Sequence, residues 1–367
     1  MKKSNLIILV VFFVIILIGV AIFLYYKKTN NTGDSQLSSL VKKTSQTKID
    51  PSSLDWEEIT SSAQWEKRDS HAVIAYKNKI FLMGGVDATK RVVSPGNIDY
   101  GNAPHFSDVW SSEDGKNWQR ILNNAPWGER RSMQLVDFKG KMWLMGGWGP
   151  EFGYRNDVWS SEDDIKWKLE IKSANWPERE GHQLLVFQNK LWLLGGVKYT
   201  THQLFSDVWS SEDGKNWERA TKSAEWSPRW DHMSVVFNNK LWTIGGMDFT
   251  DNLLKDIWSS GDGITWSLVN KNPPFESRQG FVLTDYKDRL WVINRFNVPL
   301  YGSGPNDVWF SEDGISWKKT TKDPIWTGRE DVGSVVFKDR IWILGGMDKN
   351  WTWKNDIWAS TANVENN

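Results

Sequence analysis

The sequence of 367 residues contains no cysteine, which excludes disulfide bonds, thiolate metal sites and thiol nucleophiles. It also lacks an excess of either charge, because 45 Lys and Arg residues balance 45 Asp and Glu residues. A neutral chain has no long-range field that attracts nucleic acid, so we expect no nucleic-acid partner. Histidine is scarce at five residues, whereas tryptophan is abundant at 26, and most tryptophans recur at fixed intervals.

One stretch of the sequence, DVWSSEDGKNW, occurs twice without change, starting at Asp108 and at Asp207. Edited or shortened copies start at Asp157, Asp256, Asp307 and Asp356. The first Trp of the motif recurs every 49 to 51 residues. A period of this size is typical of propeller blades and solenoid units.

Each repeat predicts four short antiparallel strands. In the third repeat, residues 182–187 and 191–194 are apolar, β-prone runs joined by a tight connection. A pair of glycines ends the second strand, the third strand lies around Val208-Trp209, and the fourth begins at Trp217 after an SSEDG turn. Four antiparallel strands per unit, repeated around a ring, predict a β-propeller.

Every repeat but the fifth contains a double glycine, with an Arg before it and an Asp-x-Trp after it. The glycine pairs are Gly84-Gly85, Gly146-Gly147, Gly195-Gly196, Gly245-Gly246 and Gly345-Gly346. The fifth repeat has Asn294-Arg295 instead. This pattern resembles the kelch repeat, and the SEDGxxW turn resembles an Asp-box shortened by one residue. The resemblance covers residues 54–361 and implies a propeller fold.

The last repeat stops after Trp358 without a fourth strand, and the missing strand is found at the other end of the repeat region. Residues 54–58 precede the first repeat and contain a matching Trp56. We therefore expect an N-terminal strand to complete the sixth blade, which removes a free sheet edge. The sequence predicts an all-β, six-bladed β-propeller over residues 54–361, closed by that strand.

Residues 6–26 carry no charge, are rich in Ile, Leu, Val and Phe, and have lysines on both sides. A helix of this length spans about 30 Å, the thickness of the bilayer core. A cleaved signal peptide is the alternative, but its apolar region is shorter and ends in a small-residue cleavage site. A lipoprotein anchor is excluded because there is no cysteine. We expect a single uncleaved transmembrane helix within residues 1–28.

Residues 29–53 are rich in Ser, Thr, Asn and Lys and predict a flexible linker, because they offer little apolar surface to bury. Residues 362–367 form a short tail. An N-terminus this short normally stays inside the cell, so we expect a single-pass membrane protein whose propeller lies outside the cytoplasm.

The two sets of connections within the blades differ in character. Connections between strands one and two are short and uniform, with KNK, KGK, QNK, NNK, KDR and KDR in the six blades. Loops between strands two and three vary, from residues 86–106 in blade one to 347–354 in blade six. Binding residues concentrate on variable loops held by a rigid scaffold, so the face with these loops, the variable face, is the predicted functional face.

Residues repeated in every blade are expected to serve packing. The repeated arginines are Arg68, Arg130, Arg179, Arg229, Arg278 and Arg329. They could form an anion-binding ring, but pairing with the equally repeated Asp108 position is the favoured interpretation. His71, His182 and His232 occupy equivalent positions in three blades, which places them too far apart to share one metal ion. We therefore expect no metal and no cofactor.

Of the 26 tryptophans, 22 fall into four repeated positions and are expected to pack the core. Trp148, Trp230, Trp351 and Trp353 fall outside them, in segments of the variable face. Flat aromatic rings suit sugars, peptide side chains and cations, although these four could instead pack under their own loops. Polar residues and tyrosines that differ between blades lie near them, namely Arg131, Glu180, Asp231, Gln279, Arg295, Glu330, Tyr154 and Tyr301. The predicted ligand-binding residues are Trp148, Trp230, Trp351, Trp353, Arg131, Asp231, Arg295 and Glu330.

These observations favour a membrane-anchored recognition module that binds a glycan or a protein ligand through the variable face. No catalytic constellation of nucleophile and base is evident. The alternative is an enzyme acting on sugars, since proteins with similar kelch repeats include a sialic-acid mutarotase, and Asp231, Glu330, Glu180 and Arg131 could move protons. The kelch-type copper oxidases fit poorly because their cofactor requires cysteine. A structural spacer in an envelope assembly is a third interpretation, which leaves the four tryptophans unexplained.

Overall fold

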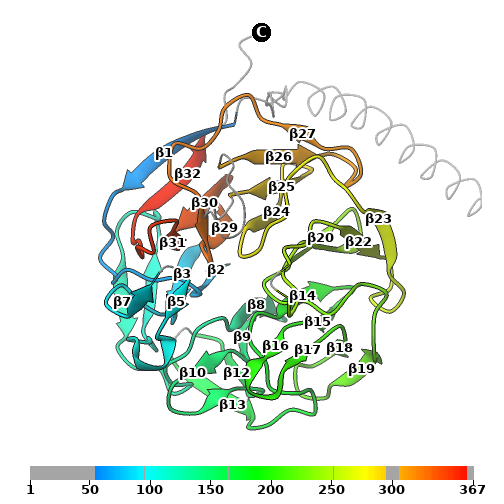
Figure 1. The fold of residues 1–367 in the computed structure, drawn as a ribbon. Coiled ribbons are helices and arrows are strands. Elements are labelled where there is room, and N and C mark those ends of the chain that lie inside the picture. The colour runs from blue at the N-terminus through cyan, green and yellow to red at the C-terminus, as the bar shows by residue number, and fades with distance from the viewer. Residues whose placement is uncertain (1–53, 95, 164, 251, 295–305, 362–367) are drawn as a thin grey trace, which may run out of the picture. The chain divides into compact units, whose positions relative to one another are not determined.

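The computed structural model describes residues 54–361 except 95, 164, 251 and 295–305. In this part of the chain, six four-stranded antiparallel sheets follow one another around a ring, as Figure 1 shows. The first strands of neighbouring sheets contact one another and line the centre. The prediction of an all-β, six-bladed propeller is therefore confirmed.

The strands of the first three blades run in sequence order from the centre outwards. Blade one comprises β2 (Ala72–Tyr76), β3 (Lys79–Met83), β6 (Val109–Ser112) and β7 (Gln119–Leu122). Blade two comprises β8 (Gln134–Phe138), β9 (Lys141–Met145), β12 (Val158–Ser161) and β13 (Trp167–Ile171). Blade three comprises β14 (Gln183–Phe187), β15 (Lys190–Leu194), β18 (Val208–Ser211) and β19 (Glu218–Thr221).

The next two blades repeat this order, and the sixth borrows its outer strand. Blade four comprises β20 (Met233–Phe237), β21 (Lys240–Ile244), β22 (Ile257–Ser260) and β23 (Ser267–Asn270). Blade five comprises β24 (Val282–Tyr286), β25 (Arg289–Ile293), β26 (Val308–Ser311) and β27 (Lys318–Lys319). Blade six comprises β29 (Gly333–Phe337), β30 (Arg340–Leu344), β32 (Ile357–Thr361) and β1 (Asp55–Thr60).

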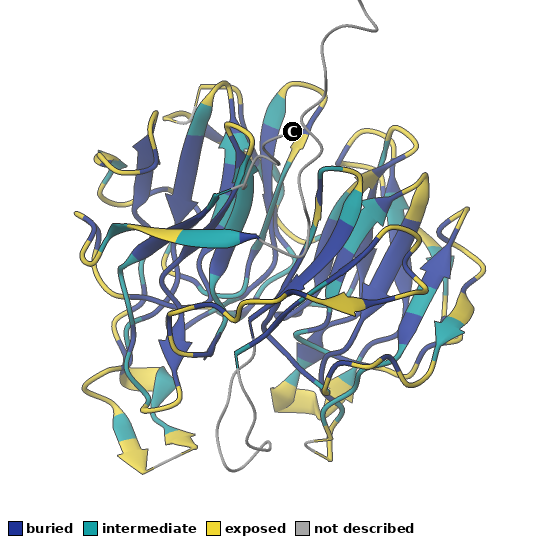
Figure 2. Cartoon of the chain, turned by 90° about the horizontal axis from the view of Figure 1, so that it is seen from above, coloured by how far each residue is buried: buried dark blue, intermediate teal, exposed yellow. Residues whose placement is uncertain are grey.

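The variable face carries short two-stranded pieces and two 3₁₀ turns. The pieces pair β4 (Val92–Ser94) with β5 (Asn97–Ile98), β10 (Trp148–Gly149) with β11 (Gly153–Tyr154), β16 (Val197–Lys198) with β17 (Gln203–Leu204), and β28 (Arg329–Glu330) with β31 (Met347–Asp348). The turns are η2 (Tyr100–Asn102) and η3 (Tyr199–Thr201). Figure 2 shows the burial of the blades edge-on, with exposed residues concentrated in the connections.

The ring closes where β1 pairs with β32, as the sequence predicts. Asp55 lies opposite Thr361 and Glu58 lies opposite Trp358, so the N-terminal strand fills the outer place in blade six. This pairing leaves no unpaired outer edge on β32. In the other blades the end of the third strand leads into the short SEDG turn, so β1 begins on the face of the short turns, opposite the variable face.

The repeated tryptophans pack the blades against one another. The aromatic residue three positions before each repeated Arg meets the fourth-strand Trp of the same blade edge-on, for example Trp176 and Trp217 with ring centroids 6.2 Å apart. Equivalent pairs occur in the other five blades, with Phe275 replacing Trp in blade five. Together with the second- and third-strand rings they build one apolar cluster between each pair of neighbouring blades. The packing role predicted for these positions is confirmed.

The repeated arginines are buried and paired, so the structural interpretation of them is confirmed. Each donates to the Asp that opens the DVW motif of its own blade, at 2.5–3.0 Å. Arg179, for example, also donates to the carbonyl of Gly195 at 2.8 Å, while Asp207 accepts from the Trp209 indole at 2.8 Å. Buried charges are tolerated when they are paired and hydrogen-bonded in this way.

His71, His182 and His232 immediately precede the first strands of their blades and pack against the glycine pairs of neighbouring blades. A Cβ atom on Gly146 would lie 2.6 Å from the His182 ring, which explains why glycine is needed there. Burial lowers the pKa of His71 and of His182 to about 3, so both rings are neutral at physiological pH. Among the described residues, no three potential ligands gather into a metal site.

In blade five, which lacks the glycine pair, the side chain of Asn294 makes the hydrogen-bonded link to the next blade. In blade three, the Gly196 amide donates to the Arg229 carbonyl of the next blade at 2.9 Å. In blade five, the carboxamide of Asn294 donates to the Arg329 carbonyl at 2.7 Å and accepts from the Arg329 amide at 3.1 Å. Asn294 adopts a φ of 74°, a conformation that Asn tolerates better than most residues. The departure from the repeat therefore preserves the link between the blades.

No helix among the described residues is long and apolar enough to cross a membrane. The predicted anchor within residues 1–28 and the linker at 29–53 lie outside those residues, as does the tail at 362–367. The anchor therefore stays a prediction.

We predict that Asp207→Asn destabilises the propeller by about 3–5 kcal/mol, because it leaves the buried Arg179 guanidinium without its counter-charge. The matched control is Glu212→Gln, which removes the exposed partner of Lys190, a pair whose loss costs at most about 1 kcal/mol. Urea denaturation measures both changes. Equal effects of the two substitutions would contradict the role given to the buried pairs.

Candidate functional site

The residue that follows each repeated Arg changes from blade to blade, and neighbouring blades never share the same residue. These residues are Asp69, Arg131, Glu180, Trp230, Gln279 and Glu330. Backbone bridges hold several of them against the variable loops, including Arg131 to Trp148 and Glu180 to Val197. The buried Arg fixes the backbone on one side and the loop fixes it on the other. An invariant scaffold thus presents a varied set of side chains around the axis.

Five of these six side chains line a cavity of about 300 Å³ at the centre of the propeller, the central cavity. Its walls are formed by Tyr100, Arg131, Ser132, Glu180, Tyr199, Trp230, Asp231, Gln279, Glu330 and Asp331. The two tyrosines open the 3₁₀ turns η2 and η3 of the variable loops in blades one and three. Side chains from five blades and two loops therefore meet at one place on the variable face.

Arg131 contributes a cation to the central cavity, and three side chains contact its guanidinium group. Its Nε atom lies 3.3 Å from the Glu180 carboxylate. Its guanidinium lies 4.0 Å from the ring centroid of Tyr100 and 5.5 Å from that of Trp148. Burial alone lowers the pKa of Arg131, but Glu180 and Tyr100 raise it above its ordinary value, so the group stays charged. This fixed charge is a donor ready for a ligand oxygen.

Carboxyl groups surround Arg131, the one cation among the described residues that line the cavity. Desolvation raises the pKa of Asp231 and of Glu330 well above the ordinary range, and repulsion from Asp331 raises both further. The pKa of Asp69 is raised by the same two causes, desolvation and repulsion from Asp331. Gln279 donates to Glu330 at 3.2 Å. A carboxyl group kept protonated both donates and accepts hydrogen bonds, which makes these residues versatile partners for hydroxyl groups.

A strained backbone ring forms the floor of the central cavity. Ser70, Ser132, Asp231 and Asp331 all have φ near 50°, and glycine occupies the equivalent places in blades three and five. Backbone hydrogen bonds link these positions from blade to blade, for example Asp331 to Gly280 at 2.9 Å. Residues other than glycine rarely adopt this conformation, and such strain persists where the surrounding structure enforces it.

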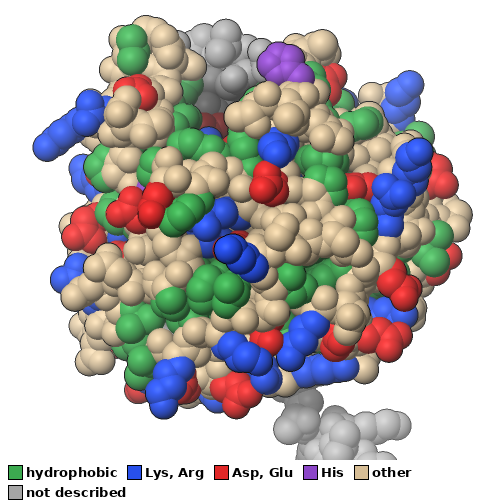
Figure 3. All heavy atoms as spheres, turned by 90° about the horizontal axis from the view of Figure 1, so that it is seen from below, with side chains coloured by type: hydrophobic (Ala, Val, Ile, Leu, Met, Phe, Trp, Pro, Cys, Tyr) green, Lys and Arg blue, Asp and Glu red, His purple; other side chains and the backbone are tan. Residues whose placement is uncertain are grey.

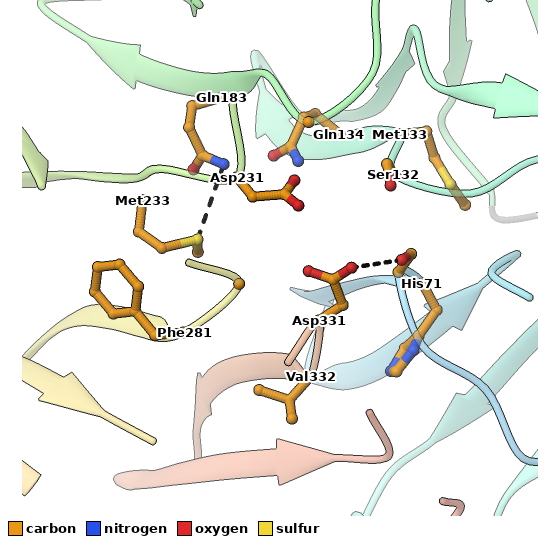
Figure 4. A pocket seen from close by; sticks show the side chains of 13 residues that line it. His71, Ser132, Met133, Gln134, Gln183, Asp231, Met233, Phe281, Asp331 and Val332 are labelled. Carbon is orange, nitrogen blue, oxygen red and sulfur yellow. Dashed lines mark hydrogen bonds between the residues drawn. The ribbon is translucent and has the colours of Figure 1, made fainter. Parts of the chain in front are cut away.

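Below the floor lies a smaller cavity of about 110 Å³. Figure 4 shows Asp231 and Asp331 pointing into it, with Met233 and Phe281 on one side. The Ser70 hydroxyl donates to Asp331 at 2.8 Å. Asp231 and Asp331 line both cavities and thus connect them.

The structure separates the predicted binding residues into two groups. The central cavity is lined by Arg131, Trp230, Asp231 and Glu330. Trp148 does not line it but contacts the Arg131 guanidinium with its ring. Trp351 and Trp353 instead belong to an apolar cluster under the loops of blades one and six.

Trp353 is fully buried there, so it offers no ring face to a ligand, and for it the packing alternative applies. Of the neighbouring polar candidates, Glu180 and Gln279 line the cavity, and the Tyr154 hydroxyl accepts from the backbone amide of Tyr199, a cavity residue, at 3.2 Å. Arg295 and Tyr301 lie outside the described residues.

Five residues at or beside the site were not predicted from the sequence, namely Asp69, Tyr100, Ser132, Tyr199 and Asp331. Asp69 follows the repeated Arg of blade one, and Ser132 and Asp331 occupy the same repeat position as Asp231, so repeat alignment could have found these three. Tyr100 and Tyr199 lie in loops of different length that align with nothing in the other blades. Only the folded structure brings them to the cavity.

We predict that Glu330→Gln makes stability less dependent on pH. A carboxyl whose pKa is raised by folding favours the native state below its unfolded pKa of about 4.3. Its contribution then falls as the pH rises towards the folded-state pKa. The parent should therefore lose stability relative to Glu330→Gln between pH 5 and pH 8, by about 1.4 kcal/mol for each unit of raised pKa. Denaturation at several pH values measures this difference.

The control for this experiment is Glu58→Gln, which changes an exposed glutamate on β1. It should leave the pH profile of the parent unaltered. A Glu330→Gln profile parallel to that of the parent would show that Glu330 does not titrate abnormally.

Comparison with known proteins places the chain by its fold. No family model and no curated protein matches the sequence. The solved structure of YjhT superposes with a TM-score of 0.65 at 14% sequence identity, covering 84% of this chain and 98% of that chain. The likeness shows the fold alone: the chain is a six-bladed β-propeller.

Proposed function

We propose that the propeller binds a small saccharide in the central cavity. The observation that carries this proposal is the convergence of differing polar side chains from five blades beneath the rings of Tyr100, Tyr199 and Trp230. A volume of about 300 Å³ is at the lower end for small-molecule sites. Such a site is too enclosed for a folded protein partner and suits a ligand of about one sugar ring.

The hydrogen-bonding capacity of the central cavity matches a polyhydroxylated ligand. Protonated carboxyl groups, the Gln279 carboxamide and the Arg131 guanidinium offer donors and acceptors side by side. The buried Gln279 Oε1 atom accepts no hydrogen bond from any described protein group. Buried polar atoms are normally satisfied, so this oxygen is available to a hydroxyl group of a ligand.

The proposed membrane anchor agrees with this location of the site. β1 begins on the face opposite the variable face, so residue 54, which follows the predicted linker, lies on the side of the propeller away from the central cavity. A propeller tethered in this way outside the cytoplasm would present the cavity to its surroundings. Sedimentation of the full-length chain with membranes, and its release on deletion of residues 1–28, tests the anchor.

That nucleic acid is not a partner stays an expectation, drawn from the balance of charge in the sequence. On the face that Figure 3 draws, acidic and basic side chains are interspersed. This mixture agrees with the balance of 45 basic and 45 acidic residues. Binding of nucleic acid depends mainly on a concentrated positive field.

A second candidate function is acid–base catalysis on a sugar, of the mutarotase type. Asp231 and Glu330 line the same cavity, and desolvation raises the pKa of both, which favours the protonated form that a general acid needs. A protonated carboxyl would give its proton to the ring oxygen while a carboxylate removes the proton of the anomeric hydroxyl. The ring C–O bond then breaks to give the open-chain carbonyl form, and reversal of these steps closes the ring as the other anomer.

For binding, we predict that the full-length chain, purified in a detergent without a sugar headgroup, binds at least one of glucose, galactose, N-acetylglucosamine and N-acetylneuraminic acid. Trp230→Ala should weaken binding about tenfold, because it removes a wall of the cavity. The control is Trp351→Ala, which alters an off-repeat Trp outside the cavity and should bind like the parent. Calorimetric titration measures all three proteins. Binding of none of these sugars would reject the saccharide proposal and favour a protein ligand.

For catalysis, we predict that the parent accelerates anomer exchange of the bound sugar, followed by NMR of the freshly dissolved anomer. Glu330→Gln should slow this exchange roughly 100-fold or more while retaining measurable binding, because it removes proton transfer and keeps a polar group of similar shape. Exchange at the spontaneous rate in a parent that binds the sugar would leave recognition as the function.

A further inference from the structure

An exposed group of aromatic residues lies beside the central cavity on blades three and four. It consists of Tyr199, His202, Trp230 and Phe249, which we call the rim cluster. The Tyr199 ring meets Trp230 edge-on at 5.3 Å and Phe249 at 6.4 Å, and His202 lies 5.8 Å from Phe249. Tyr199 is 37% exposed and Phe249 is 41% exposed, so the cluster presents apolar ring surface to solvent.

The loops that carry the rim cluster are held in place by their own hydrogen bonds. The Asp248 carboxylate accepts from the amides of Thr250 and Asn252 at 2.8 and 3.0 Å, which fixes the turn that carries Phe249. His202 adopts a φ of 50° at the end of η3, and its amide donates to the Tyr199 carbonyl at 3.0 Å. The rings are therefore positioned before any ligand arrives, which lowers the entropic cost of binding.

The rim cluster continues the wall of the central cavity. Tyr199 and Trp230 line the cavity, and Tyr199 also contacts Phe249 on the outer side. A ligand that fills the cavity and extends beyond it on this side must pass over Tyr199 towards Phe249. Since the cavity suits about one sugar ring, the next unit of a longer chain would lie on the cluster.

We propose that the rim cluster is a second sugar subsite, so that the ligand is the end of an oligosaccharide chain rather than a free monosaccharide. The proposal rests on the saccharide function proposed for the central cavity. The terminal unit occupies the cavity and hydrogen-bonds to its polar groups. The neighbouring unit stacks its apolar C–H face on Phe249 and Tyr199, while its hydroxyl groups remain in water.

Another exposed aromatic residue on the variable face offers a matched control. Phe152 lies in the loop between β10 and β11 of blade two and is 57% exposed. The Arg155 guanidinium stacks 4.1 Å from its ring centroid, and the ring does not line the central cavity. Phe152 thus matches Phe249 in type and exposure but lacks continuity with the cavity.

The test compares single sugars with chains of two or three units, using the full-length protein. The pairs are glucose with cellobiose, galactose with lactose, N-acetylglucosamine with N,N′-diacetylchitobiose, and N-acetylneuraminic acid with 3′-sialyllactose. We expect the parent to bind the disaccharide or trisaccharide of at least one pair about tenfold more tightly than the free terminal unit. Phe249→Ala should abolish this gain and leave binding of the free unit unchanged, whereas Phe152→Ala should preserve the gain.

The outcomes separate the two proposals. Equal affinity of the free unit and its longer partner, or a gain that survives Phe249→Ala, overturns the subsite and leaves the central cavity as the saccharide site. Binding of no sugar in any pair overturns the saccharide function, and the subsite with it. A weaker affinity of Trp230→Ala for both members of a pair, together with a loss confined to the longer member in Phe249→Ala, supports both proposals.

Discussion

The buried ion pair between the repeated Arg and Asp of each blade is the interaction on which the rest of the structure depends. The guanidinium connects the segment that enters a blade, the turn after its second strand and the start of its third strand, as Arg179 does through Gly195 and Asp207. An unpaired charge at this depth would cost several kcal/mol, so loss of the ion pair would destabilise all three segments at once. The residue next to the Arg thereby has a fixed direction, towards the axis. Variation at that position does not disturb the scaffold, and a mixed set of side chains can be presented in one cavity.

Blade five shows how far the repeat can change while this network survives. The Asn294 carboxamide takes over the link to Arg329 that a glycine amide makes elsewhere. Val332 occupies the position held by His, Met or Phe in the other blades, and it is smaller than all of them. The larger Asn294 in blade five is thus accompanied by the smaller Val332 at the adjoining place in blade six. This exchange agrees with the need to keep volume constant in a well-packed interior.

The central cavity combines features that a purely structural channel would not need. Arg131 faces several carboxyl groups, and desolvation raises the pKa of Asp231 and of Glu330 so that neither ionises in its ordinary range. Burial of so many acidic groups without full pairing costs stability, as does the left-handed backbone of Asp231 and Asp331. Costs of this kind are typical of functional sites, where the geometry serves a ligand and not the fold. The rim cluster extends the same argument to the surface, since its apolar rings are ordered by their loops but left uncovered.

The amino-acid sequence by itself determined the number of blades, the closing strand and the packing role of the repeated Arg and Trp residues. Each of these follows from local patterns that recur six times, and a pattern that every blade shares must serve what every blade needs. The sequence also indicated part of the site, because Arg131, Trp230, Asp231 and Glu330 break the repeat. Only the tertiary structure decided that Trp353 is buried under its loop while Trp230 lines the cavity, and that Tyr100 and Tyr199 reach it. The variable loops differ in length and pack against one another, so the direction of their side chains depends on neighbouring loops that no single repeat encodes.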